Sequence, residues 1–106
     1  MNLLPAEVAA QLPALYATDG QGDAVIVWAR WFTPDSGWAW YAVEWDGADL
    51  CFGLVEGLEV ELGYFSLAEL AEARGPMGLA IERDQQWRPR ALGDVRREID
   101  DRRAGE

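Results

Sequence analysis

The sequence predicts an α+β domain, an antiparallel meander sheet of three to four strands with helices packed on one face. Four segments rich in β-branched and aromatic residues lie between residues 24 and 65. Short turns rich in Gly, Asp and Pro separate them, and such turns join neighbouring antiparallel strands. A segment with both a helix-start and a helix-stop signal follows directly, over residues 66–76.

The first three strands follow from composition and turn chemistry. Residues 24–32 are apolar on both faces for most of their length, which predicts a central strand. A turn over 33–37 leads to a second strand over 38–45, in which aromatic side chains fall on both faces. The Asp46-Gly47 pair is a strong hairpin signal and predicts a third strand at about 49–55.

The fourth predicted strand, at about 59–65, alternates acidic and apolar residues. Such alternation is typical of an antiparallel strand with one wet and one buried face. We therefore expect one face to be solvated and the other to pack on the core. The solvated face holds Glu59, Glu61 and Gly63, and the buried face holds Val60, Leu62 and Tyr64.

Two short helices flank this sheet in the sequence. Residues 5–12 predict the first, because Pro5 suits the first helical position and Pro13 ends or bends the helix. Ser66 and Glu69 form a capping box that starts the second, and Gly75-Pro76 stops it.

The C-terminal part is predicted to be more charged and less regular. Residues 78–84 form a short extended piece with Leu79 and Ile81 inward. Residues 91–103 fit a charged helix, and residues 100–106 are expected to fray. We therefore predict one α+β domain over residues 1–90 and a charged helical or partly disordered tail over 91–106. The apolar positions of the predicted helix are Leu92, Val95 and Ile99.

The charge of the chain is uneven. The 106 residues carry 19 acids and 9 bases, a net charge of −10, and every base is Arg. Residues 1–73 hold twelve acids and one base, Arg30, whereas residues 74–106 hold eight Arg and seven acids. The first part therefore carries −11 and the second +1.

The residue inventory removes most enzyme classes. The absence of His and Lys excludes a His-based acid, base or metal ligand and a lysine Schiff base. Cys51 is a lone thiol in an apolar strand, which predicts an inert buried side chain. Paired carboxylates could act as acid and base or hold a hard cation, but acids alternating along a strand indicate a solvated face. We predict no catalytic residues, no metal and no cofactor.

The cluster of tryptophans has two interpretations. Five of the six Trp lie between residues 28 and 45, where cross-strand aromatic pairs would stabilise the sheet. Both faces of the second strand carry aromatics, so some rings should instead be exposed to a partner. A base-stacking platform would need a basic groove, which the first 73 residues lack, so no direct nucleic-acid binding is expected.

The sequence also predicts a location. The N-terminus has no positively charged start and no long apolar core, so a signal peptide is not expected. No apolar run approaches the roughly 20 residues that span a bilayer. We therefore expect a cytoplasmic protein with no membrane contact.

Several motifs resemble those of a known family. They are Glu-Leu-Gly-Tyr-Phe-Ser-Leu at 61–67, Arg-Gly-Pro-x-Gly-Leu at 74–79 and Ile-Glu-Arg-Asp at 81–84. They resemble a family of small bacterial proteins classed only as a domain of unknown function and common on plasmids, prophages and integrative elements. The resemblance covers about residues 3–90 and implies a mobile-element setting without established catalytic residues.

Setting and charge together give the leading hypothesis, an acidic protein-binding module of a mobile element. In its specific form the protein is an anti-CRISPR or anti-restriction inhibitor that imitates DNA and occupies a basic nucleic-acid-binding surface of a host defence complex. The alternatives are an accessory interaction protein whose acidity only gives solubility, and a carboxylate-only enzyme. The predicted acidic face is Asp46, Asp49, Glu56, Glu59 and Glu61, and the predicted aromatic anchors are Trp28, Trp38 and Trp40.

Overall fold

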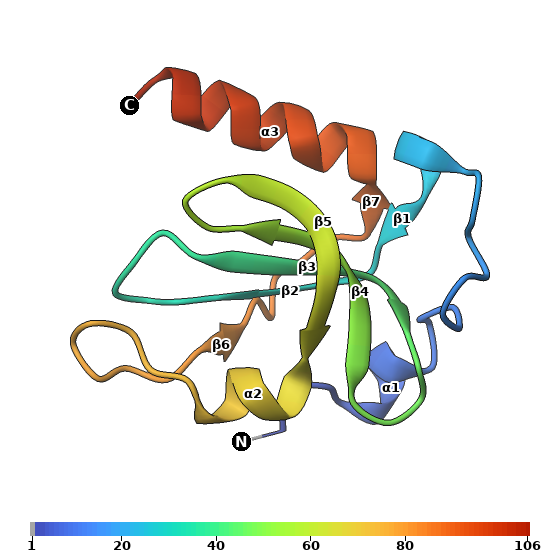
Figure 1. Cartoon of the computed structure of the whole chain (residues 1–106), viewed down its shortest axis with the longest axis horizontal. Coiled ribbons are helices and arrows are strands. Elements are labelled where there is room, and N and C mark those ends of the chain that lie inside the picture. Colours follow the sequence, from blue (N-terminus) through green and yellow to red (C-terminus); the bar gives the residue numbers. More distant parts are fainter. Residues whose placement is uncertain (1) are drawn as a thin grey trace.

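A computed structural model describes residues 2–106, and Met1, the first residue of the predicted 1–90 domain, lies outside it. The fold is α+β, as predicted, with the element order shown in Figure 1. The helical elements are α1 (Ala6–Ala9), the 3₁₀ turn η1 (Gly22–Ala24), α2 (Leu67–Glu72) and α3 (Leu92–Ala104). The strands are β1 (Ile26–Val27), β2 (Ala29–Phe32), β3 (Ala39–Trp45), β4 (Leu50–Glu56), β5 (Val60–Ser66), β6 (Glu82–Arg83) and β7 (Arg90–Ala91).

The main sheet has five antiparallel strands in the order β5-β4-β3-β2-β6, more than the three or four predicted. The additional strand is β6, which pairs with β2 at the outer edge. The predicted single strand over 24–32 is divided at Trp28, where β1 leaves the main sheet and pairs with β7. Local propensity marks these residues as extended but does not show which partner each half will take.

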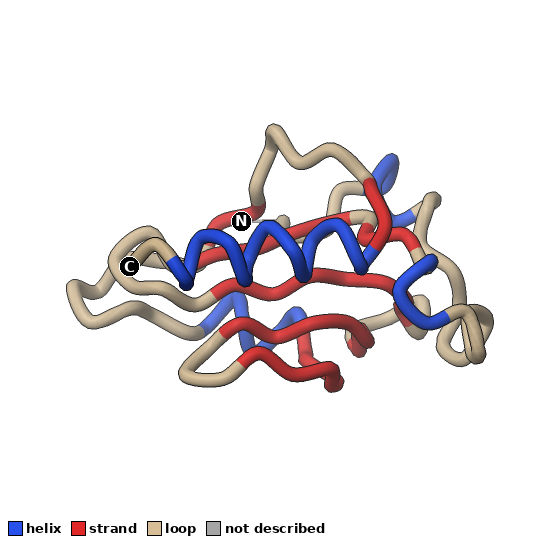
Figure 2. Tube along the Cα trace, turned by 90° about the horizontal axis from the view of Figure 1, so that it is seen from above, coloured by secondary structure: helices blue, strands red, loops and turns tan. Residues whose placement is uncertain are grey.

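The helices lie on both faces of the sheet, so the expectation of helices on one face is wrong. Buried residues of α3 share one core cluster with inward residues of β1, β3 and β4. Leu70 of α2 and the half-buried Val8 of α1 belong to a second cluster, around Trp31. Figure 1 shows α3 on one side of the sheet and α1 and α2 on the other, and Figure 2 shows α3 running lengthwise over the strands.

The predicted buried face of β5 is wrong for two of its three residues. Leu62 is 47% exposed and Tyr64 50% exposed, and only Val60 of that face packs against the α3 cluster. β5 is an edge strand, whereas the side chains of α3 cover the central strands. The buried residue of β5 is Phe65, on the opposite face, with its ring edge-on to Trp31 at 5.9 Å.

The predicted start of α2 is confirmed, whereas the first helix, predicted over 5–12, is shorter and spans only Ala6–Ala9. The Ser66 hydroxyl accepts a hydrogen bond from the backbone N–H of Glu69 at 3.2 Å, as the capping box predicts. Leu79 is 47% exposed, contrary to prediction, because only Ile81 of the extended piece turns into the core. Residues 100–104 are helical rather than frayed, since α3 continues to Ala104.

The predicted apolar positions of α3 are all buried. Leu92, Val95 and Ile99 are each at most 3% exposed and pack with Tyr41 and Leu54 of the sheet. The C-terminal residues therefore share a core with the strands that precede them.

We expect Gly53→Ala to destabilise the fold by about 3 kcal/mol, measured by urea unfolding. A Cβ at Gly53 would lie 1.7 Å from the Tyr41 carbonyl oxygen, a backbone atom that cannot move without breaking the β3–β4 ladder. Gly63 is paired with Gly53 on β5 and has open space at its Cβ position. Gly63→Ala is therefore the control, and equal losses in the two variants would contradict the close approach.

Candidate functional site

Asp46 and Asp49 are engaged at the β3–β4 turn. One carboxylate oxygen of Asp46 accepts the backbone N–H groups of Ala48, Asp49 and Leu50 at 2.8–3.0 Å. These bonds favour the charged form and lower the pKa of Asp46. Asp49 accepts the Ser66 hydroxyl at 2.5 Å and the Ala68 N–H at 2.7 Å, which fixes the start of α2.

Glu56, another predicted surface acid, is buried at 2% exposure. Its carboxylate accepts the Tyr41 hydroxyl at 2.7 Å and pairs with Arg102 of α3 at 2.7 Å. Arg103 lies 3.8 Å away. A buried carboxylate needs such partners, since an uncompensated charge in the core is costly.

The five predicted acids therefore do not form one anionic face. Glu59 and Glu61 are exposed; Glu59 lies in the β4–β5 turn and Glu61 in β5. Asp46 and Asp49 lie at the other end of β4, whose seven residues span roughly 20 Å.

The structure does bring together four of the predicted residues, which we name the Trp–Glu patch: Trp38, Trp40, Glu59 and Glu61. Trp40 is paired with Val55, and Val55 in turn with Glu61, so their side chains share one face of β3, β4 and β5. Trp38, Glu59 and Glu61 line one shallow hollow together. Trp28, the third predicted anchor, is half-buried at the break between β1 and β2 and does not belong to this patch.

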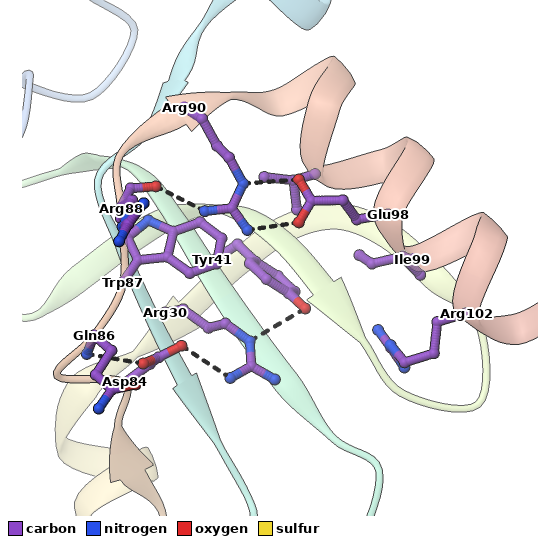
Figure 3. Close-up of a pocket in the computed structure, with 11 residues that line it drawn as sticks. Arg30, Tyr41, Asp84, Gln86, Trp87, Arg88, Arg90, Glu98, Ile99 and Arg102 are labelled. Atoms are coloured by element: carbon purple, nitrogen blue, oxygen red, sulfur yellow. Dashed lines mark hydrogen bonds and ion pairs between the residues drawn. The ribbon is translucent and has the colours of Figure 1, made fainter.

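Sequence reasoning missed a second feature, a cluster of arginines around an open cavity of about 390 Å³. Four of the nine Arg line it, together with Tyr41 and Trp87 (Figure 3). They come from β2, the segment before β7, β7 itself and α3, and are Arg30, Arg88, Arg90 and Arg102. The one usable signal was that Arg30 is isolated among acids while the other eight Arg follow residue 73.

Ion pairs and aromatic contacts organise this cavity. Arg30 pairs with Asp84 at 3.3 Å, and Arg90 forms a two-pronged pair with Glu98 at 2.7–2.8 Å. The Arg90 guanidinium also lies over the Trp87 ring at 3.9 Å. The Arg90 hydrogen bond lowers the pKa of Glu98, so this carboxylate is not a raised-pKa acid of the kind general acid catalysis needs.

Cys51 is fully buried, as predicted, and burial raises the pKa of its thiol to about 12. The thiol is therefore protonated at neutral pH, whereas a nucleophile must be a thiolate. Within residues 2–106, no group of three or more His, Cys, Asp and Glu is placed to hold a metal. Across the same residues, none of the helices has the length and apolar character to cross a bilayer.

Together these features define a small acidic α+β module with one exposed aromatic patch and one arginine-lined cavity. The chain belongs to the family described as "Protein of unknown function (DUF2958)", whose model matches residues 3–94. This confirms the predicted kinship with a domain-of-unknown-function family over nearly the same range. Comparisons with curated proteins and with solved structures give no match.

The Tyr41–Glu56 contact predicts an alkaline stability change. Burial raises the pKa of Tyr41 from 10.0 to about 12; Arg30 opposes this shift and the Glu56 hydrogen bond adds to it. The folded protein therefore holds this proton more tightly than the unfolded chain, so stability present below pH 10 is lost as the pH rises to 12. The loss should be about 2–3 kcal/mol, measured by urea unfolding at each pH.

Tyr41→Phe is the matched control. It has no phenol to titrate, so it should lack the fall in unfolding free energy that Tyr41 causes between pH 10 and 12. Cys51 titrates over the same range in both proteins, so the difference between their pH profiles isolates Tyr41. Identical declines would show that Tyr41 does not hold its proton this way.

Proposed function

We propose that this protein is an acidic protein-binding module and that the Trp–Glu patch is its contact surface. The observation that carries the proposal is the meeting of two exposed carboxylates with a tryptophan pair on one sheet face. An exposed ring beside charged groups is the arrangement found at many protein interfaces, where Trp is a frequent anchor.

The tryptophan pair is rigid. Trp38 is 41% exposed and stacks on Trp40, with ring centroids 6.0 Å apart and an interplanar angle of 28°. Trp40 packs against the second core cluster, which anchors the pair. A Cβ at Gly57 would lie 2.5 Å from the Trp38 ring, so this glycine allows the ring to lie flat on the turn. A preorganised ring loses little conformational entropy on binding.

The charge of the patch favours a basic partner surface. Glu59 and Glu61 are exposed, and Leu58 between Gly57 and Glu59 is 90% exposed, which adds apolar area at the tip. In the specific form of the proposal, the partner is the basic nucleic-acid-binding surface of a host defence complex in the cytoplasm. This form rests on the resemblance to mobile-element proteins, and the module itself contacts neither nucleic acid nor membrane and performs no catalysis.

The placement of the acids limits which residues could imitate DNA. Glu56 is buried, and Asp46 and Asp49 lie at the other end of β4, so mimicry at the Trp–Glu patch would depend on Glu59 and Glu61. The competing proposal, an accessory module whose acidity only gives solubility, predicts an interface that depends on the tryptophans and little on salt. A carboxylate-only enzyme would need a pair of raised-pKa acids in a pocket, and the cavity acids Asp84 and Glu98 are instead paired with Arg.

Affinity capture from a host lysate, followed by reconstitution with the captured complex, tests the proposal. Trp38→Ala should weaken binding by about tenfold or more, since it removes the anchor. The double variant Glu59→Arg with Glu61→Arg should weaken binding to a basic partner. This loss of affinity should be larger at low ionic strength than at high ionic strength. Binding and inhibition are measured by titration at two ionic strengths.

Two controls match these variants. Tyr64→Ala removes an equally exposed ring on the other face of β5, and Glu72→Arg with Asp101→Arg makes the same charge change elsewhere. Loss of binding with Trp38→Ala but not with the charge reversal would favour the solubility alternative. Full binding by both patch variants would refute the patch.

A further inference from the structure

We propose that the arginine-lined cavity beneath α3 is a binding site for the phosphoryl group of a small phosphorylated molecule. The site goes beyond the proposed function, since it lies on the face of the sheet that α3 covers, opposite the face of Trp40. Figure 3 shows Arg30 and Arg102 directed into the cavity on either side of the Tyr41 hydroxyl.

Arg30 has unused hydrogen-bond donors. Its Nε donates to the Tyr41 hydroxyl at 3.4 Å and its Nη1 to Asp84 at 3.3 Å, both long contacts. A guanidinium carries five N–H groups, so three remain for a ligand. Its side chain is 26% exposed, which leaves a route from solvent.

Arg102 faces Arg30 with similar freedom. Its Nη2 pairs with Glu56 at 2.7 Å, and its side chain is 50% exposed. The buried Glu56 holds the Tyr41 hydroxyl as well, so one carboxylate orients both Tyr41 and Arg102. The position of both guanidinium groups is thus set before any ligand arrives, which lowers the entropy cost of binding.

The remaining residues define the wall and the charge. Arg90 uses three of its five N–H groups on Glu98 and the Arg88 carbonyl, so its position is fixed and it mainly shapes the wall. Arg88 is exposed, and no salt bridge joins it to another side chain among residues 2–106. Four Arg against three carboxylates, Asp84, Glu98 and the Arg102 partner Glu56, leave an excess of one positive charge in a chain of net charge −10.

These features select the ligand. Two guanidinium forks with free donors suit a phosphate dianion, which offers three oxygens. The Trp87 ring already has Arg90 over one face and forms a T-shaped pair with the Tyr41 ring at 5.7 Å, so it is a poor platform for stacking a base. The strongly negative surface also repels a polyanion. A small phosphorylated molecule therefore fits better than a nucleic-acid strand.

Titration of the ¹⁵N-labelled full chain at constant ionic strength tests this site. The probes are inorganic phosphate, pyrophosphate, adenosine 5′-monophosphate and a short single-stranded oligonucleotide. We expect saturable shifts of the Trp87 indole N–H, with a dissociation constant below about 1 mM for one of the small phosphates. No saturable shift with any small phosphate would overturn the proposal, and so would tighter binding of the oligonucleotide than of every small probe.

Variants locate the binding. Arg30→Gln and Arg102→Gln should each weaken binding about tenfold, and Arg97→Gln, on the exposed side of α3, should leave it unchanged. Arg102→Gln also removes a partner of the buried Glu56, so a loss of binding in that variant could reflect a structural change. Arg88→Gln disturbs no internal contact, and it should weaken binding several-fold. Wild-type affinity in both Arg30→Gln and Arg88→Gln would refute the site, while the Trp–Glu patch would be unaffected.

Discussion

The fold depends most on one buried carboxylate, that of Glu56 at the end of β4. At 2% exposure, this carboxylate would be costly to bury without partners. Tyr41 of β3 and Arg102 of α3 satisfy it at 2.7 Å each, so a central strand, its neighbour and the last helix meet at a single charge. Apolar contacts of Leu92, Val95 and Ile99 hold α3 to the sheet, and the hydrogen bond from the Leu92 N–H to the Val25 carbonyl at 2.7 Å fixes its start. The ion pair between Arg102 and Glu56 fastens its other end.

The same short segment links the two candidate surfaces. Glu56 orients the Tyr41 hydroxyl and Arg102 in the cavity, while the next residue, Gly57, supports the Trp38 ring on the other face. The Gly57 carbonyl also accepts Arg103 at 2.6 Å, so α3 holds the turn that carries the patch. Arg102 in the cavity and Trp38 in the patch are therefore connected through two adjacent residues, Glu56 and Gly57.

Local signals in the sequence were sufficient for most elements and insufficient for the site. Ser66 with Glu69, the Asp46-Gly47 turn and the spacing of Leu92, Val95 and Ile99 each act within a few residues, and the elements they mark are present. The burial of Glu56 depends on partners 15 and 46 residues away, Tyr41 and Arg102, which no local pattern contains. Leu62 and Tyr64 were misassigned for a related reason, because alternation shows that a strand has two faces but not which one the helices cover. The meeting of Trp38 with Glu59 likewise became visible only through strand register.

The position of α3 in the chain has a consequence for how the protein is made. The helix that covers Val27, Tyr41 and Leu54 follows the strands in the chain, so it is synthesised after the sheet that it covers. Until it emerges, the growing chain carries a sheet with one apolar face open and a carboxylate at Glu56 that has not yet met Arg102. Such a face is a surface that chaperones and proteases recognise. A chain released before residue 102 therefore leaves this face open, and quality control should remove it.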